Sequence, residues 1–198
     1  MSLVVVVLLL AVLVGKVAGG GLRGLTTINL GRVWLVWIAF AVQFVLAFLP
    51  ADLRGPLRVP LLCVAFAAVV WWMTTVWDGL GAALRVALML VALGWVMNLT
   101  VITLNSGMPV SAETLERVGL PSDDIESGDL SKHVTLDDDT VLPWLGDVIP
   151  LPLVGPLRKA VSLGDVVMLV GLLVFVPAAM RRDPDPEPDP DSDHVPAT

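Results

Sequence analysis

A small set of polar residues in an otherwise apolar chain has the types and spacing to form a chemical site: Asn98, Asn105, Asp147 and Asp165. Both aspartates belong to a repeated motif, LGDV. Carboxylates that converge can transfer protons or hold a cation. The alternative is local, since an aspartate in a turn or in a helix's first turn stabilises that element by itself. We favour the local role and keep the four residues as a candidate polar site without a catalytic assignment.

The two asparagines lie on one face of an apolar run. Gly94, Asn98 and Asn105 are spaced by four and seven residues, which places them on the same side of a helix. A polar group buried in an apolar environment needs a hydrogen-bond partner. This stripe therefore predicts a polar contact where the helix meets the segment after Asn105.

Composition indicates that these polar residues lie in a membrane protein. The chain of 198 residues is 56% hydrophobic and 16% charged, with a mean hydropathy of +0.84. Soluble proteins are about 25% charged. The net charge of −7 argues against nucleic-acid binding. Cys63 is the only cysteine, which excludes an intrachain disulfide and a cysteine metal cluster. We predict no metal and no cofactor.

Five apolar runs predict an all-α integral membrane bundle of about five transmembrane helices. The runs cover residues 2–18, 33–49, 60–77, 83–104 and 162–180, within one domain of residues 1–182. Residues 183–198 alternate Asp or Glu with Pro and predict a disordered tail.

Two connections between these runs carry glycine or proline. Residues 19–32 extend two GxxxG motifs that begin at Gly15 and Gly20. Such motifs can form helix-contact faces, but a flexible turn is our favoured interpretation. Ala51–Arg58 contains Pro56 and predicts a tight turn before the third helix.

Basic residues orient the bundle. Lys16, Arg23 and Arg32 follow the first run, and such residues are retained in the cytoplasm. Five spans then place the amino terminus outside the cell membrane and the carboxyl-terminal tail in the cytoplasm. Residues 105–161 form one long extracytoplasmic segment. Arg58 and Arg158 lie on the outer side against this rule.

Within residues 105–161, Ser111 is expected to cap a short helix that Gly119 closes. Residues 133–142 suggest a hairpin around Asp137–Asp139, where a solvated acidic turn is favoured over a calcium site. We expect residues 121–140 to be solvated. Residues 142–157 hold four prolines and predict an irregular interfacial or re-entrant stretch.

The chain resembles a bacterial multi-pass membrane-protein family of unknown function, DUF5317. The resemblance rests on the glycine-rich link, the second run with its Trp residues and Gln43, NSGMPVS after the fourth run, LGDVIPLP, and SLGDVVMLVG in the fifth. It implies a multi-pass membrane protein, and it brings no assigned activity and no catalytic residues.

Three functions follow as hypotheses. The first is a non-enzymatic structural or interaction component whose partners are the lipid bilayer and either another membrane protein or a second copy. The second is a membrane enzyme or lipid-linked substrate handler with an outer-leaflet site near Asn105, Asp147 and Asp165. The third and weakest is a small transporter, with Gln43, Asn98 and Asp165 along its path.

Overall fold

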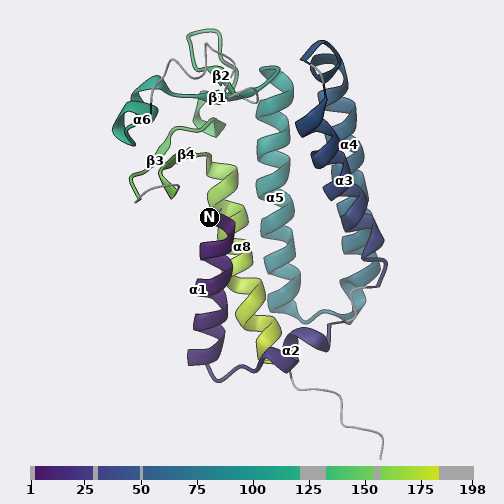
Figure 1. The fold of residues 1–198 in the computed structure, drawn as a ribbon. Helices are drawn as coiled ribbons and strands as arrows, with labels where there is room; N and C mark the ends of the chain where they lie inside the picture. The colour runs from purple at the N-terminus through teal and green to yellow at the C-terminus, as the bar shows by residue number, and fades with distance from the viewer. Residues whose placement is uncertain (1–2, 29–30, 50, 121–132, 154–156, 183–198) are drawn as a thin grey trace, which may run out of the picture.

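The computed structural model of the chain is mostly helical and describes residues 3–28, 31–49, 51–120, 133–153 and 157–182. It has helices at all five predicted positions, which lie side by side as a bundle, and the described part of residues 105–161, here called the outer segment, lies at one end (Figure 1). These helices are α1 (Leu3–Val17), α3 (Trp34–Phe48), α4 (Ala51–Val76), α5 (Ala82–Leu104) and α8 (Leu163–Met180).

Three helical stretches are long and apolar enough to cross a membrane: Gly55–Gly79, Ala82–Leu104 and Leu163–Met180. The other two, α1 and α3, have 15 residues each. At about 1.5 Å per residue they cover about 22 Å, which is less than the roughly 30 Å of a bilayer's hydrocarbon core. Length alone therefore supports three spans and leaves two shorter apolar helices.

The contact between α5 and α8 is the most extensive in the bundle, and glycine makes it close. A Cβ atom on Gly94 would overlap the Gly164 carbonyl oxygen and would lie 2.9 Å from the Met168 nitrogen. One on Gly171 would lie 2.9 Å from the Ala87 oxygen. The two backbones consequently touch along the seam, as small residues allow between membrane helices.

The turn that we favoured after α1 is present at Ala18–Gly19, where Gly19 has a φ of +83°, but Gly20 and Gly24 pack closely against α8 as a helix-contact face would. A short helix, α2 (Leu22–Thr26), follows α1, and both lie against the end of α8 (Figure 1). A Cβ on Gly20 would come within 2.8 Å of the Met180 Cβ, and the Gly21 nitrogen donates to the Met180 oxygen at 2.8 Å. The physical reason is that only glycine lets this chain segment touch the α8 terminus.

The predicted tight turn at Ala51–Arg58 is wrong, because α4 begins at Ala51 and continues through Pro56 and Pro60. A proline inside a helix removes one backbone hydrogen bond, a cost that membrane helices tolerate when neighbours pack against them. Here α3 packs along α4 as an antiparallel hairpin. A single 3₁₀ turn, η1 (Trp77–Gly79), then leads into α5.

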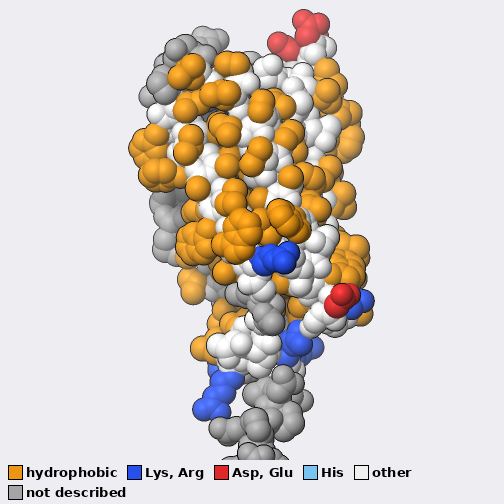
Figure 2. Space-filling view, turned by 90° about the vertical axis from the view of Figure 1, so that its right-hand side faces the viewer, with side chains coloured by type: hydrophobic (Ala, Val, Ile, Leu, Met, Phe, Trp, Pro, Cys, Tyr) orange, Lys and Arg blue, Asp and Glu red, His pale blue; other side chains and the backbone are white. Residues whose placement is uncertain are grey.

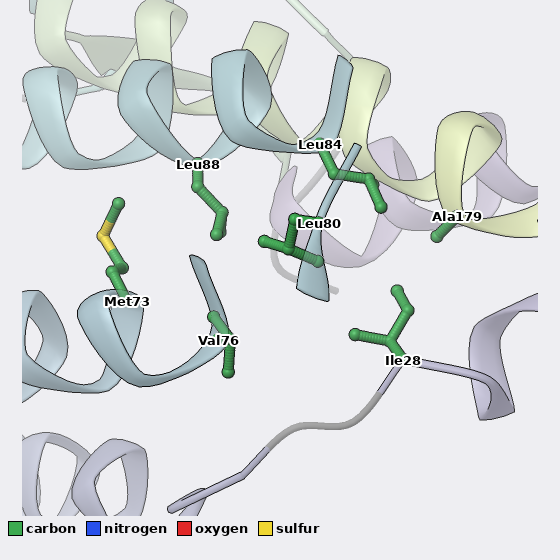
Figure 3. Close-up of a cluster of buried hydrophobic side chains, with 7 residues drawn as sticks. All are labelled: Ile28, Met73, Val76, Leu80, Leu84, Leu88 and Ala179. Carbon is green, nitrogen blue, oxygen red and sulfur yellow. The ribbon is translucent and has the colours of Figure 1, made fainter. Parts of the chain in front are cut away.

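A cluster of buried apolar side chains joins the helices at the end of the bundle opposite the outer segment. They come from the segment after α2, from α4, from the turn before α5, from α5 and from α8, and they point toward one another (Figure 3): Ile28, Met73, Val76, Leu80, Leu84, Leu88 and Ala179. This cluster holds the α3–α4 hairpin to the remaining helices.

The outer segment contains four short strands within its described residues, beyond the single hairpin that we predicted inside an all-α fold. Strand β1 (Met108–Val110) pairs in parallel with β2 (His133–Thr135), and β3 (Ile149–Leu151) pairs antiparallel with β4 (Lys159–Val161). The hairpin predicted at residues 133–142 is therefore wrong, because β2 joins β1 instead. Asp137–Asp139 do form an exposed turn, in which the Asp137 carboxylate accepts from the Asp139 nitrogen at 3.1 Å.

Two further elements complete the outer segment. Helix α6 (Ala112–Arg117) has Ser111 as its N-cap and Gly119 at a φ of +70° behind it, as predicted. A 3₁₀ turn, η2 (Pro143–Leu145), begins the stretch at residues 142–157, whose described part holds this turn and β3 and no α-helix; its interfacial or re-entrant placement stays a prediction. The predictions for residues 121–132 and for the tail at 183–198 lie outside the described residues.

The helical body presents apolar side chains outward. On the face that Figure 2 shows, hydrophobic groups cover most of the body, and Lys and Arg side chains gather toward its lower end. Helix α3 illustrates this, since Trp37 is 67% exposed and Phe40 is 69% exposed. Aromatic groups of this size are rarely left in water, and lipid is the environment that suits them.

Candidate functional site

The candidate site lies where the outer segment joins α5 and α8, and Asn105 forms its first contact. Asn105 is the C-cap of α5. Its side-chain nitrogen donates to the Val101 and Val141 carbonyl oxygens, both at 2.9 Å, and its side-chain oxygen accepts from the Val141 nitrogen at 2.8 Å. The amide thus pairs with the backbone of Val141 as a neighbouring strand would, and it fixes the outer segment to the end of α5.

The residues that follow Asn105 and Val141 both have a left-handed backbone conformation. Ser106 has a φ of 57° and Leu142 a φ of 55°. This conformation costs a non-glycine residue about 1–2 kcal/mol, so the surrounding contacts must maintain it. One such contact is that Arg58 of α4 donates from Nη1 to the Ser106 carbonyl oxygen at 2.7 Å. The α3–α4 hairpin therefore also contacts the outer segment.

The first LGDV motif packs against β1. A Cβ on Gly146 would lie 2.6 Å from the Pro109 oxygen, so glycine is required for this approach. The Asp147 backbone nitrogen donates to that same oxygen at 2.7 Å. The Asp147 backbone carbonyl oxygen accepts from the Ser111 backbone nitrogen at 3.3 Å. Asp147 is only 6% exposed. Its backbone thus lies beside β1 and is joined to that strand by a single parallel bridge.

The second LGDV motif packs against Asn98 of α5. The Asn98 nitrogen donates to the Asp165 carboxylate at 2.8 Å, and the Ser162 hydroxyl donates to the Asn98 side-chain oxygen at 2.9 Å. Ser162 also caps α8 by accepting from the Asp165 nitrogen at 2.9 Å. Gly164 lies against the Asn98 side chain, with no room for a Cβ. These residues form a closed polar triad, Asn98–Ser162–Asp165, inside the α5–α8 seam.

Both motifs therefore have the same structural role, the first against β1 and the second against α5. In each, the glycine allows close contact and the aspartate forms hydrogen bonds that anchor the turn. Both partners lie on one continuous stretch of chain, since Asn98 is in α5 and Pro109 is in the strand that follows it. The first motif thus closes a contact within the outer segment, and the second joins α8 to α5.

The chemistry open to the triad is limited by burial. A serine beside an aspartate can act as a nucleophile only if a base takes its proton and a substrate reaches it. Ser162 is 0% exposed, and its hydroxyl proton is directed to an amide oxygen, which is not a base. The geometry therefore suits holding two helices together. Within the described ranges, no group of three His, Cys, Asp or Glu residues is arranged to hold a metal ion.

The structure brings together some of the four predicted residues but not all. Asn98 and Asp165 are in direct contact, and the capping role predicted for Ser162 is confirmed. Asn105 bonds Val141, and Asp147 is tied to β1, so these residues have separate partners. Gln43 lies in α3, within the hairpin.

Sequence reasoning missed several residues that hold the outer segment. Arg58 is 48 residues from its partner Ser106, and nothing in the sequence connects them. Thr114 of α6 donates from its hydroxyl to the Val148 oxygen at 3.1 Å and is 5% exposed. The bond from Ser162 to Asn98 had a partial signal, because a buried asparagine predicts a partner without identifying it.

Comparison with known proteins gives one match. A protein-family model described as a family of unknown function, DUF5317, matches residues 27–177. These residues include α3, α4, α5, the outer segment and most of α8. No curated protein and no solved structure matches the chain.

Proposed function

We propose that this chain, which belongs to the family of unknown function DUF5317, is a multi-pass membrane protein that acts as a non-enzymatic interaction component of the cell membrane. One observation carries the proposal. The side chains of Asn98, Asn105 and Asp165 bond to one another or to backbone: the Asn105 bonds attach the outer segment to the end of α5, and the Asn98–Asp165 bond joins α5 to α8. Polar groups committed in this way favour a rigid display surface over a reaction centre.

Five spans are the arrangement that we propose for the bundle. Helix α1 lies along α8, which is itself long and apolar enough to cross a membrane. The shortfall in length of α1 is reduced by Lys16, whose long side chain can extend to the headgroups. Helix α3 is the antiparallel partner of α4 and carries Trp34 and Trp37 at its start, as interfacial helices do.

The orientation follows from the basic residues at the end of the bundle where α2 lies. Lys16, Arg23, Arg85, Arg181 and Arg182 belong to elements that end or begin there. The positive-inside tendency places that end in the cytoplasm and the outer segment outside. A reporter domain that is active only in the cytoplasm should then give a signal when it is fused after Arg182. A signal from a reporter that is active only outside the cytoplasm would show the opposite topology.

The outer segment carries exposed apolar side chains that suit contact with a partner. Trp144 is 57% exposed, Val141 is 45% exposed and Leu153 is 38% exposed. All three lie outside the α-helices: Trp144 is in η2, Val141 is bonded to Asn105, and Leu153 follows β3. A rigid apolar surface at the membrane boundary favours binding to another membrane protein or to a second copy of this chain.

A crosslinking experiment tests this function. A photoreactive amino acid would replace Trp144, or, as a matched control, Leu9 of α1, which is 60% exposed. After irradiation of intact membranes, we expect a protein adduct from position 144 and only lipid adducts from position 9. A clean monomer from both positions, together with a monomeric protein after mild detergent extraction, would contradict an interaction role.

A further inference from the structure

A groove lies between α4 and α5, beside the η1 turn. It has a volume of about 420 Å³ and is lined by Val70, Met73, Thr74, Trp77, Asp78 and Ala92. This volume is within the range of small-molecule sites, about 300–1,000 Å³. Met73 belongs both to this lining and to the buried cluster in Figure 3, so the floor of the groove is fixed by the core.

One end of the groove, at Trp77 and Asp78, lies where two candidate membrane spans end. The span Gly55–Gly79 finishes in η1, and the span Ala82–Leu104 begins just after it. Its apolar walls therefore extend into the hydrocarbon depth, while Trp77 and Asp78 lie at headgroup level, where tryptophan is enriched. A ligand that fits must have an apolar chain and a polar head.

Charged groups of both signs lie at the η1 turn, which contributes Trp77 and Asp78 to the lining. Arg85 donates from Nε to the Trp77 oxygen at 3.1 Å, and its guanidinium carbon is 5.5 Å from the Trp77 ring centroid. Arg182 donates from Nη1 to the Gly79 oxygen at 3.0 Å. A guanidinium has five N–H donors, so these bonds leave donors for a phosphate. Asp78 is exposed and lies between Trp77 and Gly79, whose carbonyl oxygens accept these bonds.

We propose that this groove binds one phospholipid of the phosphatidylethanolamine type. An acyl chain lies between α4 and α5, the phosphate pairs with Arg85 and Arg182, and the primary ammonium pairs with Asp78. The carboxylate decides the headgroup, because it repels a purely anionic lipid and accepts hydrogen bonds from an ammonium. A choline headgroup has no N–H to donate and fits less well. The inference rests on the membrane placement proposed above.

Lipid retention tests the proposal. The full-length protein would be placed in nanodiscs with equal amounts of phosphatidylethanolamine, phosphatidylglycerol and phosphatidylcholine, then released and weighed by native mass spectrometry. We expect one retained lipid, with phosphatidylethanolamine favoured about two- to fivefold, the effect of a partly exposed ion pair. Asp78→Asn should remove the preference over phosphatidylcholine. Combined Arg85→Gln and Arg182→Gln should reduce retention of all three lipids.

A steric pair tests the groove itself. Val70→Trp fills the groove and should abolish retention, whereas Val64→Trp adds the same side chain to an exposed position of α4 outside the lining. Equal retention of the three lipids, preference for phosphatidylglycerol, or unchanged retention by Val70→Trp would overturn the proposal. Resistance to alkaline extraction is measured on the same proteins: a protein that stays in the membrane but retains no lipid refutes only this inference, and one that is extracted refutes the proposed function too.

Discussion

The bundle has two contrasting seams that share one helix. On one side of α5, glycines bring its backbone against α8, and the polar triad closes the outer end of that contact. On the other side, α5 meets α4 through large side chains, such as the edge-to-face pair of Phe66 and Trp95, whose ring centroids are 5.9 Å apart. The groove of about 420 Å³ lies on this second side, between α4 and α5.

The difference shows how residue size decides what a helix pair can do in a membrane. Small residues let backbones approach and exclude everything else, which gives a rigid seam. Large residues hold helices apart and leave gaps between the points where they touch. The α5–α8 seam is therefore suited to carrying the outer segment, and the α4–α5 seam is suited to accepting a ligand.

The largest expected effect comes from breaking the glycine seam with Gly94→Ala. The added Cβ would overlap the Gly164 oxygen and crowd Met168, so the helices must separate. We expect a loss of about 3 kcal/mol, the upper part of the range for overpacking. Unfolding in detergent, followed by circular dichroism, measures it.

The matched control is Gly55→Ala in α4, where an added Cβ meets open space. Alanine is the better helix former by up to about 1 kcal/mol, so this variant should be unchanged or slightly more stable. Equal losses in Gly94→Ala and Gly55→Ala would refute the contrast between the seams.

The role of Gly94 could be partly anticipated from sequence. Its spacing with Asn98 predicted one polar face on a helix, and this face does meet another element. The partner could not be predicted, because Gly164 follows Gly94 in the sequence only after the whole outer segment, and no local pattern encodes that contact. For the same reason the glycines after α1 suggested a turn, although Gly20 and Gly24 touch the end of α8.

The next effect comes from Asn98→Ala, which removes the centre of the triad. The Asp165 carboxylate and the Ser162 hydroxyl would each lose a partner in a partly buried position. We expect about 2 kcal/mol of lost stability, within the range for leaving buried polar groups unsatisfied. The midpoint of thermal unfolding in detergent provides the measurement.

Two companion variants separate structure from chemistry at the triad. Asp165→Asn keeps an oxygen acceptor for Asn98 and should cost clearly less than Asn98→Ala. Thr100→Ala removes a bond to the Val96 oxygen on the exposed side of the same helix and should change little. If Asp165→Asn were the most harmful of the three, the carboxylate charge itself would be essential, and the triad would not be merely a helix contact.

A smaller and more local effect is expected from Asn105→Ala. It removes the hydrogen bonds that hold Val141 to the end of α5, in a partly exposed place, and we expect about 1 kcal/mol. Hydrogen exchange at the Val141 amide should accelerate while the amides of α8 stay protected. Thr140→Ala, which alters only the neighbouring acidic turn, is the control. An unchanged Val141 exchange rate would show that other contacts hold the segment.

The outer segment was the least predictable part of the chain. Its capped helix α6 depends on neighbouring residues, and the sequence identified it. Its strands pair over long separations, since β1 meets β2 across residues that belong to no shared pattern. The expected hairpin at residues 133–142 failed because alternation predicts a strand without naming its partner. The true hairpin, β3 with β4, contains Pro150, which argues against a strand in sequence terms.

The smallest expected effect sharpens the contrast from the other side, at the α4–α5 seam. Phe66→Leu removes an aromatic pair across a seam that is already loosely packed, so we expect about 0.5–1 kcal/mol. Phe44→Leu is the control, since the ring of Phe44 contacts that of Phe48 on its own helix and is 65% exposed. Thermal unfolding compares them. A loss near that of Gly94→Ala would mean that the aromatic seam is as rigid as the glycine seam, and residue size would then no longer explain the groove at the α4–α5 seam.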